Sequence, residues 1–139
     1  MKIKKIYSKK NKTKLIHMVY RMNSSKKNRV NISPENQFLQ VANINLEKDN
    51  TFKAHKHVWK KPSYKKKIAQ ESWVVIKGLV QVYFYDTDGT FLTKTILKQG
   101  DLSISFEGGH NYKSLKNKTK VYEFKTGPYE GVKLDKVFI

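Results

Sequence analysis

Three of the four histidines in this chain have the types of neighbours and the spacing that a metal site requires. His55 and His57 form an H-x-H pair, and residues two apart on a strand point to the same side, so one strand would present both imidazoles. Glu71 and His110 follow later in the chain. Three imidazoles and a carboxylate suit a transition metal better than calcium or magnesium. We therefore expect His55, His57, Glu71 and His110 to hold one divalent transition metal (Fe, Zn, Ni, Mn or Cu).

The segments around these residues resemble the two cupin motifs. H-K-H at 55–57, with E-S-W-V-V-I-K-G at 71–78, is similar to the first motif, although thirteen residues separate the two parts. G-D-L-S-I-S-F-E-G-G-H at 100–110 is similar to the second, with Phe106 in place of its proline. The tail, Y-E-F-K-T-G-P-Y at 122–129 and D-K-V-F at 135–138, resembles the WbuC-type cupin-fold metalloproteins, a family associated with polysaccharide gene clusters.

The resemblance covers roughly residues 36 to 139 and implies a cupin jelly-roll barrel with a bound metal. It also implies a saccharide or nucleotide-sugar ligand and a place in polysaccharide biosynthesis. Further candidates to line the pocket are Gln70, Trp73, Phe106 and Tyr112. Tyr112 shares a strand face with His110, so its hydroxyl could contact the ligand or orient the histidine.

The charge is concentrated at the start of the chain. The net charge is +18, and residues 1–30 contain eleven Lys and Arg and no acid. Only two of the 29 basic residues are arginine, which disfavours specific nucleic-acid recognition. We therefore expect residues 1–35 to form a basic, largely irregular arm and residues 36–139 to form the barrel domain. Five lysines between residues 60 and 67 suggest an electropositive entrance for an anionic saccharide.

The remaining pattern predicts an all-β domain of about eight short strands with no amphipathic helix. The expected strands cover residues 38–46, 52–58, 72–77, 79–85, 90–97, 102–106, 110–115 and 119–125. Asp86-Thr87-Asp88-Gly89 is a strong hairpin signal. The chain has no cysteine, no apolar run of transmembrane length and no nucleophile or nucleotide-binding motif. We expect a cytoplasmic location. A homodimer is one oligomeric state that the sequence allows.

Three classes of function stay open at this point. The first is a metal-dependent cupin protein acting on a saccharide. The second is a metal-free cupin isomerase or epimerase whose histidines act as general acid and base. The third is non-catalytic, either a sugar-binding module or a protein whose basic arm binds an anionic surface. Stoichiometric metal in the purified protein would favour the first class over the second.

Overall fold

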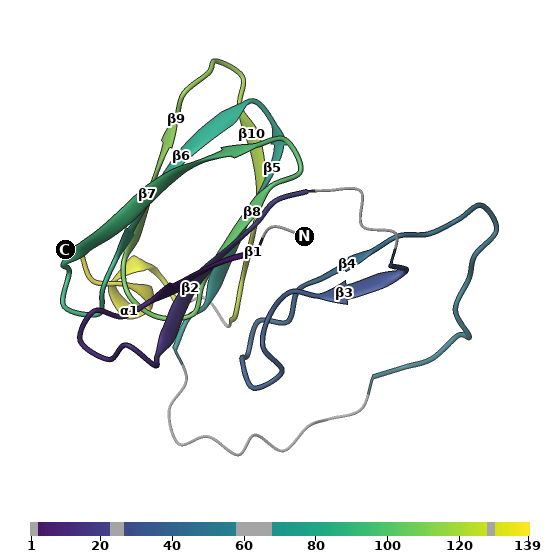
Figure 1. Cartoon of the computed structure of the whole chain (residues 1–139), viewed down its shortest axis with the longest axis horizontal. Coiled ribbons are helices and arrows are strands. Elements are labelled where there is room, and N and C mark those ends of the chain that lie inside the picture. Colours follow the sequence, from purple (N-terminus) through teal and green to yellow (C-terminus); the bar gives the residue numbers. More distant parts are fainter. Residues whose placement is uncertain (1–2, 23–26, 58–67, 128–129) are drawn as a thin grey trace.

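The computed structural model describes residues 3–22, 27–57, 68–127 and 130–139 and is predominantly β (Figure 1). The strands are β1 (Ile3–Tyr7), β2 (Leu15–Tyr20), β3 (Arg29–Asn31), β4 (Ala42–Ile44), β5 (Glu71–Lys77), β6 (Leu79–Tyr85), β7 (Phe91–Lys98), β8 (Leu102–Ser105), β9 (His110–Ser114) and β10 (Lys120–Lys125). One short helix, α1 (Val132–Asp135), is the sole helix of the described part. The prediction of a mostly β protein is confirmed. No helix of the described residues is long and apolar enough to cross a bilayer.

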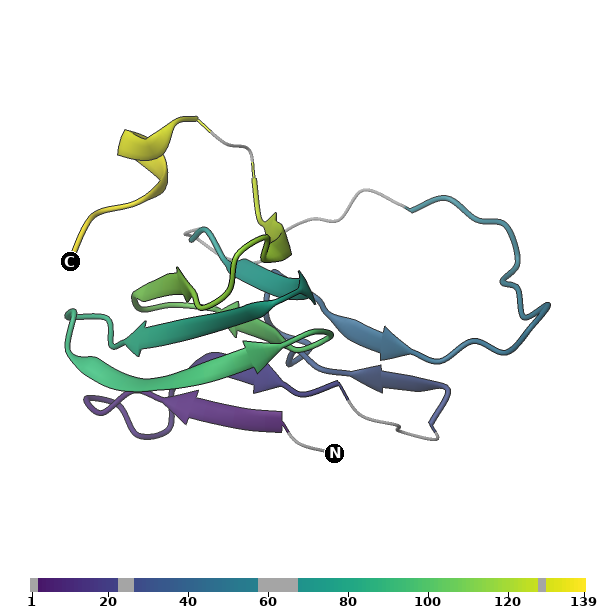
Figure 2. The ribbon, with the colours of Figure 1, turned by 90° about the horizontal axis from the view of Figure 1, so that it is seen from above.

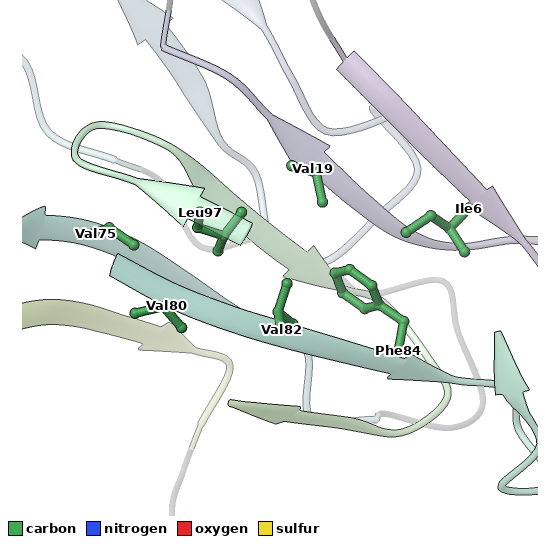
Figure 3. Packing of buried hydrophobic residues seen from close by; sticks show 7 residues of the cluster. All are labelled: Ile6, Val19, Val75, Val80, Val82, Phe84 and Leu97. Carbon is green, nitrogen blue, oxygen red and sulfur yellow. The ribbon is translucent and has the colours of Figure 1, made fainter. Parts of the chain in front are cut away.

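Two antiparallel sheets face each other and enclose the main core. The larger sheet has the order β1-β2-β8-β5-β10 and the smaller has the order β7-β6-β9. On β6, Val80, Val82 and Phe84 alternate with exposed or half-exposed residues and are buried between the sheets (Figure 3). Their partners come from four other strands: Ile6, Val19, Val75 and Leu97. Within the described residues the strands form open sheets, with no closed barrel.

The N-terminal stretch belongs to the larger sheet, so the prediction of a largely irregular arm is wrong. β1 pairs with β2, and β2 pairs with β8 near the end of the chain. Ile16 through Tyr20 are all buried, because β2 has a strand on each side and apolar side chains against each face. Polar contacts reinforce the attachment: the Asp86 carboxylate accepts hydrogen bonds from Ser8 Oγ and Lys9 N at 3.0 and 2.7 Å.

A third layer covers the outer face of the larger sheet. It contains the hairpin of β3 and β4 and the turns between them. A second apolar cluster lies under this layer. It consists of Met18, Tyr20, Ile32, Leu102, Ile104 and Phe106, with Leu39, Val41 and Val74 packed against it. Both faces of the central strands β2, β8 and β5 are therefore covered.

The predicted strand at residues 52–58 is not formed over its described part. Residues 51–57 have no regular secondary structure, and every residue from 45 to 57 is exposed. The segment extends beyond the β3–β4 hairpin, on the opposite side of the molecule from the C-terminal residues (Figures 1 and 2). The predicted strand at 38–46 is reduced to the three residues of β4. Among the described residues no apolar partner covers residues 51–57, which explains why they do not form a strand.

Candidate functional site

Polar side chains gather at one end of the space between the two sheets. Val75 on β5 packs in the main core, so Trp73 and Glu71, two and four residues earlier, share its inward face. On the facing sheet, His110 and Tyr112 of β9 lie opposite Phe84 and Val82 of β6 and share their inward face. The alternation of each strand thus places four chemically useful side chains beside the core.

Glu71 and His110 form a direct pair across the two sheets. His110 Nε2 lies 3.1 Å from Glu71 Oε1, and both side chains are largely buried. The carboxylate accepts, so Nε2 carries the proton, and in a neutral His110 ring Nδ1 has the free lone pair. Burial opposes ionisation of Glu71. The hydrogen bond and charge of His110, with the charges of Lys136 and Lys125, outweigh it, so the pKa of Glu71 lies below its ordinary value.

Two buried nitrogen atoms beside this pair have no hydrogen-bond partner among the described residues, Nδ1 of His110 and Nε1 of Trp73. Buried polar atoms of folded proteins are nearly always satisfied, and one left open indicates water, an ion or a ligand. The Trp73 ring stacks on Tyr112 with centroids 3.9 Å apart, and the Tyr112 hydroxyl lies 3.0 Å from Ser103 Oγ. Burial raises the pKa of Tyr112 above its usual range, so this hydroxyl keeps its proton.

His17 occupies the same end of the sandwich but is fully satisfied. Its Nε2 donates to the Tyr85 carbonyl at 2.9 Å, which leaves Nδ1 to accept from Ser105 Oγ at 3.0 Å. Burial lowers the pKa of His17 to about 4, although the bond to Tyr85 opposes the shift. The sequence singled out no role for His17, because its partners lie 68 and 88 residues away. The contacts assign it a structural role.

The C-terminal segment, residues 130–139, reaches this end of the sandwich. Lys125 lies opposite Glu71 in the pairing of β10 with β5. Its ammonium group contacts Asp135 Oδ2 at 3.0 Å, and Lys136 Nζ lies 3.8 Å from the same oxygen. Two lysines therefore surround one carboxylate next to the Glu71–His110 pair. Lys125 and Asp135 lie in the tail segments that carry the family resemblance, and the sequence suggested residues 125–129 as a pocket mouth or dimer contact, but the pairing of these two side chains was not predicted, since the register of β10 could not be deduced there.

The structure brings together some of the predicted site residues and not others. Glu71, His110, Trp73 and Tyr112 lie together. His55 and His57 lie in the exposed segment, with ring centroids 5.3 Å apart and His55 Nδ1 2.9 Å from the Lys53 carbonyl. Two pocket candidates lie on the outer face instead. Gln70 binds Leu39 N and the Gln37 side chain, and Phe106 packs in the outer cluster. The lysine-rich stretch 60–67 is outside the described residues.

For a metal, the described residues offer two adjacent ligands of suitable chemistry. Glu71 supplies a carboxylate. His110 supplies Nδ1, an imidazole nitrogen that is buried and has no hydrogen-bond partner among the described residues. No group of three or more His, Cys, Asp or Glu is assembled around one point within the described ranges. His55 and His57 would complete the set if residues 45–57 folded back over the polar end. The four-residue metal site stays a prediction.

Comparison of the chain with family models, curated proteins and solved structures gives no match to any of them. The assignment of function therefore rests on the site itself.

Proposed function

We propose that the polar end of the sandwich binds a small polar molecule and that Glu71 and His110 act on it as an acid–base pair. The observation that supports this most directly is the orientation of the His110 ring. Glu71 holds the proton on Nε2, so the buried Nδ1 is left as a base with no hydrogen-bond partner among the described residues. A carboxylate that fixes the tautomer of a catalytic imidazole is a recurrent arrangement in enzymes.

The chemistry of this pair is proton transfer. His110 Nδ1 removes a proton from a carbon next to a carbonyl group, and the Glu71 carboxylate stabilises the resulting imidazolium. The imidazolium then delivers the proton to a neighbouring atom, which gives an isomerisation; an epimerisation would need a second proton donor on the opposite face of the carbon. The Trp73 indole N–H, which has no acceptor among the described residues, can donate to a hydroxyl or carbonyl oxygen of the substrate.

We further infer that the two facing sheets are those of a cupin-type jelly roll and that the substrate is a saccharide or nucleotide-sugar. The motif resemblance around residues 71–78 and 100–110 supports the fold assignment, since Glu71 and His110 come from these two motifs and lie side by side. The stacked Trp73 and Tyr112 rings support a saccharide, because aromatic rings with a polar handle suit a ligand that presents both C–H and O–H groups.

The test is exchange of substrate hydrogen with solvent deuterium. The protein is incubated in D2O with a panel of hexoses and nucleotide-linked keto-hexoses, and proton NMR follows the signal of each carbon-bound hydrogen. His110→Gln is expected to lower the exchange rate by about 10²- to 10⁴-fold. His55→Gln is the matched control and leaves it unchanged. Nitrogen NMR of the His110 ring provides a check without substrate: a proton on Nδ1 and none on Nε2 at neutral pH would contradict the proposal.

A metal centre is the second candidate, favoured by the unpaired Nδ1 of a His110 ring whose Nε2 is held by a carboxylate. In that case His110 and Glu71 would be ligands together with His55 and His57, and the metal would supply Lewis-acid or redox chemistry when bound. Elemental analysis after purification without added metal distinguishes the two candidates. Stoichiometric metal that is lost in both His57→Ala and His110→Ala supports the metal centre.

A further inference from the structure

The C-terminal segment, residues 130–139, has an inverted distribution of polar and apolar side chains. Val132 and Leu134 are exposed, and Val137 and Phe138 are 87% exposed. Asp135, in contrast, has a side chain only 10% exposed. A segment that docks through the hydrophobic effect buries its apolar side chains and leaves its acids in water. Residues 130–139 instead bury an acidic side chain and expose the apolar ones, so the carboxylate of Asp135 determines where the segment lies.

The position taken by Asp135 is a site for an anion. Lys125 projects from the inward face of β10, next to Glu71 in the strand register. Its ammonium group and that of Lys136 lie 3.0 and 3.8 Å from Asp135 Oδ2. The charges of both lysines also act on Glu71, which places this anion site beside the acid–base pair.

The attachment of the segment is otherwise small. Residues of α1 are not buried, and the end of the chain touches the sheets at the Gly108-Gly109 turn. There, Ile139 Cδ1 would be 2.4 Å from a Cβ atom added to Gly109, so the end of this side chain packs directly on the glycine. The yellow C-terminal ribbon in Figure 2 accordingly stands away from the sheets over most of its length. The segment is therefore held mainly by the largely buried ion pair between Lys125 and Asp135, and an anion that replaces the Asp135 carboxylate would keep Lys125 paired.

We propose that Lys125 binds an anionic group of the ligand, a carboxylate or a phosphate, and that Asp135 occupies its place when the ligand is absent. This inference rests on the proposed function for its location: the site that receives the anion is the one that contains Glu71 and His110. It names the substrate class as a small anionic molecule. The C-terminal segment is then a built-in competitor, which leaves Lys125 when the substrate arrives.

The experiment measures anion binding through Trp73. Trp59→Phe leaves Trp73 as the only tryptophan of the chain, and its fluorescence reports on the site. Inorganic phosphate, glucose 1-phosphate and glucuronate are titrated at constant ionic strength, with glucose as the neutral control. Asp135→Asn is expected to tighten binding of the anion by about five-fold or more, because the anion no longer has to displace a largely buried carboxylate from Lys125. Lys125→Met is expected to weaken it by about ten-fold or more, the worth of a charged hydrogen bond.

Lys113→Met is the matched control, because it removes the same charge from an exposed position of β9. It should bind the anions like the parent. A response to inorganic phosphate alone identifies a site for the free ion, whereas a response only to glucose 1-phosphate or glucuronate identifies a site for an anionic saccharide. Both support the anion site. Equal affinities in all variants, an equal loss in Lys113→Met and Lys125→Met, or no response of any variant to any anion overturns it.

All titrations are repeated in a Glu71→Gln background, where the acid–base pair is disabled but Lys125 remains. Anion binding that persists in this background, with deuterium exchange lost, supports both proposals. Anion binding without deuterium exchange in any variant, the parent included, supports the anion site and contradicts the acid–base function. Deuterium exchange that occurs although no anion binds contradicts the anion site and leaves the acid–base function supported.

Discussion

Residues 15–20 and residues 52–57 are both short stretches that carry histidine next to lysine-containing turns, yet they lie in opposite environments. Ile16 through Tyr20 are buried, whereas residues 52–57 are all exposed. The difference comes from the neighbours: β2 has a strand along each edge and an apolar cluster against each face. His17 therefore has both ring nitrogens bound by protein, while His55 and His57 are accessible to a ligand. The surroundings, rather than the residue type, separate the buried, hydrogen-bonded His17 from the exposed His55 and His57.

Deletion is the strongest way to test this contrast. Removing residues 1–22 eliminates β1 and β2, leaves an edge of β8 without its partner and takes Ile6 and Val19 from the main core. We expect the cooperative thermal transition, followed by near-ultraviolet circular dichroism, to disappear. Replacing residues 46–56 with a glycine–serine linker of equal length should change the free energy of unfolding by no more than about 1 kcal/mol. Similar effects of the two changes would contradict the comparison.

Two single substitutions test the same contrast between residues 15–20 and residues 52–57. Ile16 is completely buried and Phe52 is 64% exposed. Ile16→Ala should lower the free energy of unfolding by about 2–5 kcal/mol, because it removes buried methylene groups and leaves a cavity. Phe52→Ala should change it by less than about 0.5 kcal/mol. Urea unfolding monitored by circular dichroism gives both values, and a large loss in Phe52→Ala would show that the exposed segment packs in solution.

The pH dependence of stability separates the histidines in another way. The pKa of His17 is about 4 in the folded protein and 6.5 when unperturbed. Below pH 6.5 the unfolded chain therefore takes up a proton that the folded protein does not accept until near pH 4. Protonation thus favours unfolding, and the contribution of His17 falls by about 3 kcal/mol between pH 7 and pH 4. Urea midpoints measured across this range should show the loss in the wild type and in His55→Gln, but not in His17→Gln.

The last test concerns metal binding by the exposed histidines. If His55 and His57 join Glu71 and His110 around one ion, that ion stabilises the fold by about 2.7 kcal/mol at a hundredfold excess over its dissociation constant. The melting temperature with added zinc or nickel should rise in the wild type and fall again with a chelator, and His57→Ala should show neither change. His17→Ala is unsuitable as a control here, because it damages the core. A metal response retained in Glu71→Gln and His110→Gln but lost in His57→Ala would identify an isolated H-x-H site in the exposed segment.

The sequence predicted the C-terminal two-thirds of the sheets closely. Val80, Val82 and Phe84 alternate with more exposed residues on β6, and the turn after it has Gly89 at φ 85°, as its Asp-Gly sequence suggests. The N-terminal strands were missed for a physical reason. β1 has two exposed lysines between Ile3 and Ile6, which breaks the alternation, and β2 is buried on both faces and shows none.

The site was predicted in part. Glu71, Trp73, His110 and Tyr112 were found because their strands and turns were recognisable. The pairing of β10 with β5, which brings Lys125 beside Glu71, depends on strand register, and register is not encoded locally. His17 depends in the same way on its contacts with Ser105 and Tyr85. The roles of Lys125 and His17 therefore depend on contacts between segments that are distant in the sequence.

The order β1-β2-β8-β5-β10 has a consequence for synthesis of the chain. β2 pairs with β1 on one edge and with β8 on the other. The second edge of β2 is therefore covered only after residues 102–105 have been synthesised. At the usual speed of translation this interval is on the order of ten seconds. During that time the apolar side chains of β2 have no permanent cover, and pairing of such distant strands makes folding slow. We expect the positive charge of the lysines in and around β1 to oppose association of such partly folded chains, because like charges repel.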